Sequence, residues 1–240
     1  MSILLVKGIH AGVGASTVAA NLAAAYTVLG HKVLLVDLDA KNLIGPWFGH
    51  PTDKVTGWTD AVRGEQSWKQ ALLRDPIGCY FLPHGSAALG VSEYSNYLAD
   101  MLTSAQDKFE IIIVSAAHDF NQALIPESTL LTLQVVNPTP VCVTLLSRQL
   151  AHTPPDNKTL FVVNQCRHDI ALMRDMTLVL EDALGTRLIS AHLYYDIAIQ
   201  EAFAMLGNVM TAATRSNAAV EFRQLATVVL SQVEKNQLRT

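Results

Sequence analysis

Charged side chains are scarce in this sequence, and neither sign dominates. Asp, Glu, Lys and Arg make up 16% of the 240 residues, against roughly a quarter in an average soluble chain. The 21 acidic and 17 basic residues give a net charge of −4, with no long run of either sign. Proteins that bind nucleic acid or an anionic membrane surface usually carry a basic patch. The composition therefore argues against nucleic acid as a ligand and against a membrane-binding surface.

Cysteines are few, and long apolar runs are absent. Cys79, Cys142 and Cys166 are an odd, scattered set with neither metal-ligand spacing nor a disulfide framework, which predicts a reducing compartment. The first residues lack the charged segment, the long apolar stretch and the cleavage site of a secretory signal. No apolar run approaches the 18 or so residues of a membrane-spanning helix. These absences predict a cytoplasmic protein without membrane insertion.

Half of the residues are apolar, which is enough for a sizeable core, and their spacing alternates between two patterns. Short, nearly all-apolar runs are typical of strands buried on both faces; they lie at 3–6, 33–37, 80–82, 111–114, 133–136 and 160–163. Helical spacing follows at 16–29, 92–105, 140–150, 170–184 and 216–233. This alternation predicts an α/β fold with a doubly wound, mostly parallel sheet and helices on both faces. We expect a single domain over residues 1–240.

Local signals mark several boundaries. Gly30 stands where the first helix should end, and Ser216 where the last helix should begin. Few basic residues flank the apolar stripe of the last helix, so we expect it to pack onto the sheet rather than onto a membrane. The stretch 152–158, with two prolines, is expected to be a surface connection.

A glycine-rich loop separates the first strand from the first helix, and residues 7–17 read KGIHAGVGAST. Gly12 and Gly14 allow a positive φ and a close approach to the backbone. Consecutive amides at a helix N-terminus form a concavity that suits phosphate oxygens. Ser16 or Thr17 would place a hydroxyl on a magnesium ion. A plain strand-to-helix turn is the simpler alternative.

Two nucleotide-binding interpretations compete for this loop. A dinucleotide fold requires G-x-G-x-x-G and an acidic residue at the end of the next strand. Asp37 stands in that place, but Thr17 occupies the position of the third glycine. The long approach before Gly12 suits a phosphate loop better, so the sequence favours a mononucleotide.

The order of strand, glycine loop, helix and a strand ending in Asp-x-Asp resembles the deviant phosphate-loop ATPases typified by MinD and ParA, whose loop reads K-G-G-x-G-K-[ST]-[ST]. On that pattern His10 takes the place of the signature lysine, and Ala15 that of the phosphate-binding lysine. The resemblance implies an ATP site with magnesium. The loop residues that it implies for nucleotide binding are Ala11, Gly12, Val13, Gly14, Ala15, Ser16 and Thr17.

The resemblance extends over most of the chain. Asp37 and Asp39 are similar to the family's acidic pair, which implies that Asp37, with Ser16, holds magnesium through water and that Asp39 orients the attacking water. Asn164 resembles the asparagine that reads adenine. Asp196 lies in a late segment that resembles the one closing over the base. Both are therefore expected to bind the nucleotide.

The middle of the chain resembles a narrower group, the BcsQ family of cellulose-synthase operon proteins, which also lacks the phosphate-binding lysine. Gly57-Trp58, Trp68 and Leu82–Gly85 carry this resemblance; taken singly, each tryptophan is expected to pack in the core. The resemblance implies an accessory protein of the cellulose-synthase complex, recruited to the inner membrane through partners. The implied partners are a second copy in a homodimer, a small BcsR-like protein and the synthase complex.

The loss of cationic groups affects hydrolysis more than binding. Ala15 supplies no charge, His10 is short and an unperturbed imidazole is mostly neutral at pH 7, and Ser115 stands where the superfamily has an aspartate. Single cationic groups are worth on the order of 10³ or more in phosphoryl-transfer rate, whereas loop amides bind without them. We therefore predict a pseudo-ATPase that uses ATP as a structural or switching ligand. Two alternatives stay open: a working MinD/ParA-type ATPase, with His10 or Lys7 supplying charge, and a scaffold without a nucleotide.

Overall fold

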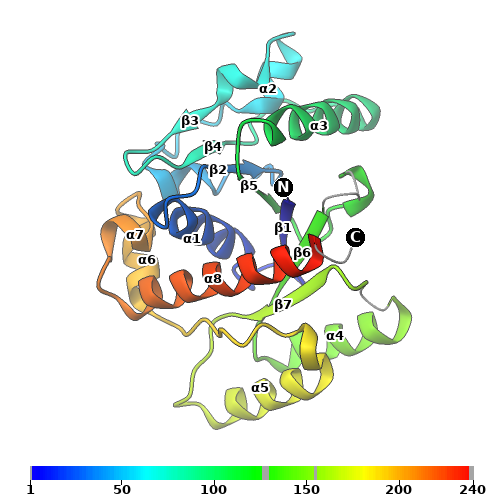
Figure 1. Ribbon diagram of the computed structural model, residues 1–240, viewed down its shortest axis with the longest axis vertical. Coiled ribbons are helices and arrows are strands. Elements are labelled where there is room, and N and C mark those ends of the chain that lie inside the picture. The colour runs from blue at the N-terminus through cyan, green and yellow to red at the C-terminus, as the bar shows by residue number, and fades with distance from the viewer. Residues whose placement is uncertain (1, 126–129, 154–155, 238–240) are drawn as a thin grey trace.

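A seven-stranded sheet forms the centre of the protein (Figure 1). The computed structural model describes residues 2–125, 130–153 and 156–237. The strand order is β3-β4-β2-β5-β1-β6-β7, and every neighbouring pair is parallel except β3–β4. The strands are β1 Ser2–Gly8, β2 Val33–Asp37, β3 Leu73–Arg74, β4 Tyr80–Leu82, β5 Ile111–Ala116, β6 Leu130–Val136 and β7 Thr159–Val163. The mostly parallel sheet predicted from the apolar runs is confirmed.

Helices cover both faces of this sheet (Figure 1). They are α1 Ala15–Val28, α2 Trp58–Arg63, α3 Val91–Gln106, α4 Pro140–His152, α5 Ala171–Leu184, α6 Ile197–Ala204, α7 Val209–Ala212 and α8 Asn217–Gln237. On β1, Leu4 and Val6 join the core formed with α1 and α8, whereas Ile3 and Leu5 join the core formed with α3. Because successive strand residues point to opposite faces, one all-apolar strand serves two cores.

The predicted boundary signals are present. Gly30 follows α1 with a φ of +95°, and its amide donates to the Thr27 carbonyl. The Ser216 hydroxyl accepts from the Ala219 amide at 3.1 Å and so caps α8. Phe222 of α8 is fully buried in the core shared with α1, which confirms packing onto the sheet. Of the stretch 152–158, Pro154 and Pro155 lie outside the described residues. Over the described ranges, no helix combines the length and apolarity that crossing a membrane requires.

Several short elements were not predicted. β3 has two residues and pairs antiparallel with β4. Short helical turns also escaped detection, since they are shorter than the stretch over which helical periodicity can be seen. They are α2, α6, α7, η1 Gly45–Phe48, η2 Trp68–Ala71, η3 Gln122–Leu124 and η5 Gly185–Arg187.

The three parts of the tryptophan pattern meet in one cluster. Trp58 is fully buried, and its indole N–H donates to the Asp37 carbonyl at 2.9 Å. The ring centroids of Trp58 and Tyr94 are 5.0 Å apart. The Trp58 amide donates to the Pro83 carbonyl at 3.0 Å. The Trp68 amide donates to the Tyr97 hydroxyl at 2.7 Å. Both tryptophans are buried, as expected, and the cluster ties α2 to the ends of β2 and β4.

Gly57 is expected to tolerate no side chain. A Cβ at this position would run into the Pro83 carbonyl oxygen and the Gly85 amide, which are both backbone atoms. We expect Gly57→Ala to lower the free energy of unfolding by about 1–3 kcal/mol or more, as overpacking does. Gly90→Ala is the control, because a Cβ there has no neighbour within 4 Å. Equal urea midpoints for the two variants would contradict this close approach.

Candidate functional site

The glycine loop is held open by its backbone geometry and by one distant side chain. Gly12 and Gly14 have φ values of +89° and +88°, in the region that favours glycine. Gly14 is the N-cap of α1 and brings no side chain to cap it. The carboxamide of Asn164, at the end of β7, donates to the Val13 carbonyl at 2.8 Å. The loop is thereby tied to a strand that lies 151 residues away along the chain.

The glycine loop lines a pocket of about 290 Å³. Within the described part of the chain, the amides of residues 11–17 have no hydrogen-bond acceptor. The first amides of any helix lack a partner inside the helix, and the helix dipole adds partial positive charge there. The pocket is lined by Gly8, His10, Ala11, Gly12, Gly14, Ala15, Ser16, Thr17, Asp39, Lys41, Leu43, Ala116, Ala117, His118 and Gln165. The loop thus has the form of an anion cradle.

The two predicted acidic residues lie in different environments. Asp37 is buried and accepts from the amides of Asp39 at 3.0 Å and Ile44 at 3.3 Å. Burial raises its pKa to about 7, and the Asp39 carboxylate adds to this rise while the two amides oppose it. Asp39, in contrast, lines the pocket. Ser115 pairs with Asp37 in the sheet register and is fully buried, and its hydroxyl oxygen has no partner among the described residues.

His10 and Lys7, the possible substitutes for the loop lysine, differ in whether they line the pocket. His10 lines the pocket: its Nδ1 lies 2.6 Å from the Ala11 carbonyl oxygen, and its Nε2 is buried without a partner in the described residues. Lys7 is not among the lining residues. Its ammonium is half-buried, and this desolvation lowers its pKa. Of the two, His10 is the one beside the loop amides.

The structure brings Asn164 to the loop but does not bring Asp196 to the pocket wall. One Asp196 carboxylate oxygen accepts from the Ala198 amide at 2.9 Å and caps α6. The other accepts from the Ala218 amide at 3.1 Å, at the start of α8. Asp196 therefore joins two helix N-termini, and its role toward a base stays a prediction.

Among the lining residues that were not singled out from the sequence, three have polar side chains: Lys41, His118 and Gln165. Each follows the carboxyl end of a parallel strand, namely β2, β5 and β7. Ligand sites of open α/β sheets lie outside these strand ends. The signal that could have found them is therefore their place after a strand, since none of them belongs to the loop motif.

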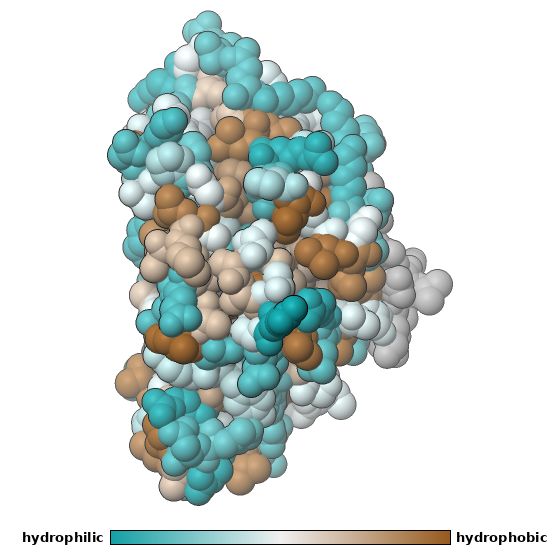
Figure 2. Space-filling view, turned by 90° about the vertical axis from the view of Figure 1, so that its left-hand side faces the viewer, coloured by the Kyte–Doolittle hydropathy of each residue, from teal (hydrophilic) through white to brown (hydrophobic). Residues whose placement is uncertain are grey.

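A second pocket adjoins the loop pocket. Next to the loop pocket, an apolar pocket of about 400 Å³ shares Ser16, Thr17 and Leu43 with it and extends to Trp47 and Phe203. Figure 2 shows apolar side chains gathered across the middle of the face that carries α6 and α7.

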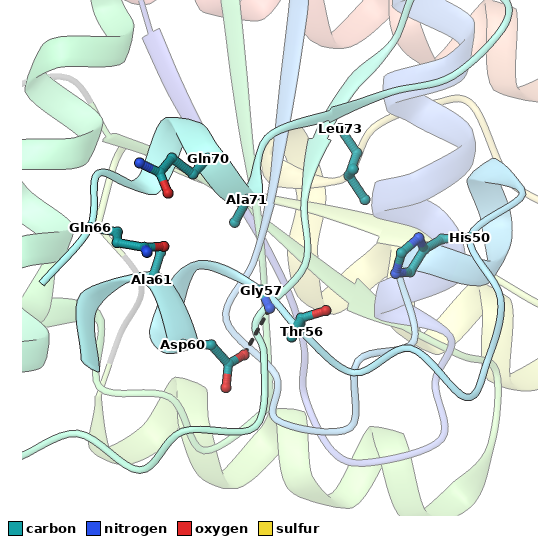
Figure 3. A pocket seen from close by; sticks show the side chains of 9 residues that line it. All are labelled: His50, Thr56, Gly57, Asp60, Ala61, Gln66, Gln70, Ala71 and Leu73. Carbon is teal, nitrogen blue, oxygen red and sulfur yellow. Dashed lines mark hydrogen bonds between the residues drawn. The ribbon is translucent and has the colours of Figure 1, made fainter. Parts of the chain in front are cut away.

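A separate pocket of about 290 Å³ lies between α2, η2 and β3 (Figure 3). Its Asp60 carboxylate is turned toward Gly57 and accepts from the amides of Gly57 and Ser86. These bonds fix α2 to the loop after β4 and occupy the one carboxylate among the described residues that line this pocket. The loop pocket therefore has the stronger case as a functional site.

A full protein ligand set for a metal is not found. In ranges 2–125, 130–153 and 156–237, no three His, Cys, Asp or Glu side chains gather in a way that could hold an ion. Magnesium in a phosphate site keeps several waters and is bound by one or two protein groups together with the phosphates. Of the two residues predicted to hold magnesium, Ser16 lines the pocket, whereas Asp37 is buried and is not among the lining residues.

Asp37 makes stability depend on pH. In the folded protein its pKa is about 7, whereas an exposed aspartate ionises near 3.8. The unfolded chain therefore releases this proton first, and wild-type stability falls as pH rises from about 4 to about 7. We expect the free energy of unfolding of Asp37→Asn to rise relative to that of the wild type by a few kcal/mol over that range. The changed hydrogen bonds add a difference that does not depend on pH.

Urea unfolding at pH 4.5 and pH 7.5, without nucleotide or magnesium, measures this difference. Asp119→Asn is the control, because that side chain is 78% exposed. A wild-type-to-variant difference for Asp37→Asn that stays constant between the two pH values would contradict the raised pKa.

Comparison with known proteins identifies relatives at two levels. A family model described as "Cellulose biosynthesis protein BcsQ" matches residues 1–230. Cellulose biosynthesis protein BcsQ of Escherichia coli (strain K12) is 28% identical over 131 residues, 51% of this chain and 52% of that protein. Tyrosine-protein kinase CpsD of Streptococcus pneumoniae is 26% identical over 124 residues, 49% of this chain and 53% of that protein. The chain spans about half the length of these curated relatives.

Solved structures share the fold over nearly the whole chain. The MinC:MinD cell division protein complex of Aquifex aeolicus contains a chain with a TM-score of 0.77 at 17% identity, over 96% of both chains. Cobyrinic acid a,c-diamide synthase from Mycobacterium smegmatis, with bound ATP analog and magnesium, gives 0.74 at 19% identity, over 98% of this chain and 97% of that one. The fold is that of the MinD/ParA P-loop NTPases. With the family model matching residues 1–230, the chain belongs to the BcsQ family of cellulose biosynthesis proteins.

Proposed function

We propose that this protein binds ATP in the loop pocket and uses it as a structural or switching ligand. The observation that carries the proposal is the row of unpaired amides at residues 11–17, a stretch that lines the pocket at every position except Val13. Backbone N–H groups at a helix N-terminus bind phosphate oxygens without any side chain. The ATP analog and magnesium bound to cobyrinic acid a,c-diamide synthase, which shares the fold, support this choice of ligand.

Magnesium would complete the site by neutralising part of the triphosphate charge. Ser16 would offer its hydroxyl, and Asp37 would accept from the ion's water shell. The unpartnered Ser115 hydroxyl beside Asp37 supports a hydrated ion here, because a buried hydroxyl without a partner is costly. A nearby dication would also favour the ionised form of Asp37, so magnesium binding and loss of its proton would be coupled.

Hydrolysis would be slow. Phosphoryl transfer depends on cations placed around the transferred group, and the loop offers Ala15 where a lysine would serve. Asp39 lines the pocket and is the residue we propose to orient a water. This arrangement supports binding more than turnover.

At the level of the cell, we propose that the protein is an accessory subunit of cellulose biosynthesis that acts at the membrane-bound synthase complex. Membership of the BcsQ family supports the process. The MinD/ParA fold supports a homodimer, and membership of the BcsQ family is the reason to propose a small BcsR-like protein as a further partner. We propose a cytoplasmic protein that partners bring to the inner membrane.

A working ATPase is the second candidate. Asp39 and the basic groups of His10 and Lys41 in one pocket favour it. Calorimetric titration with ATP, ADP and magnesium, together with phosphate release by the purified protein, separates the possibilities. We expect nucleotide binding with phosphate release far slower than that of MinD/ParA ATPases. Turnover near the rate of those ATPases would contradict the pseudo-ATPase, and no binding at millimolar nucleotide would leave a scaffold.

Substitutions in the loop locate the ligand. A Cβ on Gly14 would meet the Asn164 carboxamide and would need a positive φ, so Gly14→Ala should abolish ATP binding. Gly30→Ala is the matched control, because Gly30 has a similar φ but open space around it. Ala15→Lys should tighten ATP binding by about tenfold, the value of a hydrogen bond to a charged group. Unchanged affinity in both loop variants would show that ATP binds elsewhere.

A further inference from the structure

The segment after β2 forms part of the loop pocket. It contributes Asp39, Lys41 and Leu43 to the lining, although Asp39 lies 25 residues after Gly14 in the sequence. Lys41 is the single lysine or arginine among the described residues that line the pocket. Its ammonium and the loop amides thus share one concavity, whose described lining holds no second lysine or arginine.

The backbone around Lys41 is fixed on both sides. The Lys41 amide donates to a carboxylate oxygen of Asp39 at 3.0 Å. Next to it, Asn42 has a φ of +53°, and its side chain exchanges two hydrogen bonds with Gly85: it donates to the carbonyl at 2.9 Å and accepts from the amide at 2.8 Å. The backbone of Lys41 is therefore anchored at the pocket, and its side chain is largely exposed.

The resting partner of the ammonium is weakly held. Lys41 Nζ lies 3.6 Å from the second Asp39 carboxylate oxygen, and the Lys41 side chain is 64% exposed. The Asp39 side chain is 14% exposed, but the lysine end of the pair is open to water and the two atoms are 3.6 Å apart, so the pair contributes little. A triphosphate carries more negative charge than one carboxylate, so the ammonium would gain by turning from Asp39 to a phosphate.

We propose that Lys41 supplies the terminal phosphates of a bound nucleotide with the positive charge that Ala15 no longer provides. This inference rests on the proposed ATP site and names a residue in it that the loop motif does not include. Lys41 is a binding residue in this role. It reaches the phosphates from the second strand's end rather than from the phosphate loop.

Affinity measurements with nucleotides of different phosphate number test the role. We expect Lys41→Ala to weaken ATP binding about tenfold, as loss of a charged hydrogen bond does, and AMP binding by less than about twofold. Lys41→Arg should keep most of the affinity, and the loss in Lys41→Ala should shrink as salt rises. Lys54→Ala is the matched control, because Lys54 is an exposed lysine outside the pocket lining.

A second variant separates charge from structure. Ala15→Lys in the Lys41→Ala background should restore ATP affinity, since it returns the charge to the same pocket from another element. Thermal unfolding without nucleotide should be unchanged in Lys41→Ala. If that variant does not fold, Lys41→Gln, which keeps a polar side chain without the charge, takes its place.

The possible outcomes are distinct. A wild-type protein that binds no nucleotide would overturn the proposed function and this inference with it. Wild-type binding together with unchanged ATP affinity in Lys41→Ala would overturn the role of Lys41 alone. Equal losses for ATP and AMP would also overturn it, because they would place Lys41 away from the terminal phosphates.

Discussion

An unpaired helix N-terminus is the feature on which the rest of this site depends. Helix α1 begins at Ala15 after a glycine that offers no capping side chain, so its first amides need a partner from outside the helix. Asn164 keeps the loop in this open form by binding the Val13 carbonyl. A loop in which side chains satisfied these amides would be an ordinary turn, and the pocket would have no affinity for anions.

Two carboxylates lie near the loop, those of Asp37 and Asp39, and they differ in how deeply they are buried. Asp37 is held between two amides at the end of β2, where desolvation favours its neutral form. Asp39 lies in the pocket beside the Lys41 ammonium. A dication near Asp37 would favour the ionised form of this carboxyl, which the folded protein otherwise disfavours, so under the proposed function magnesium binding and folding stability would be linked through Asp37.

The tryptophan cluster stabilises the chain segments that follow β2 and β4. Trp58 binds the Asp37 carbonyl, and Asn42 binds Gly85, which follows β4. These contacts tie the segment after β2 to the segment after β4. The features that suggest the BcsQ family in the sequence therefore serve, in the structure, to hold the residues that line the pocket.

The sequence by itself determined the sheet, its major helices and the phosphate-loop geometry, because strand and helix periods and the positive φ of Gly12 and Gly14 are local properties. It could not reveal β3 or the short helices, which are too brief to show a period. Only the tertiary structure decided that Asp37 is buried while Asp39 is in the pocket, that Asp196 caps two helices, and that Lys41 and Gln165 reach the loop. These placements depend on where distant strand ends meet, and no local pattern encodes that meeting.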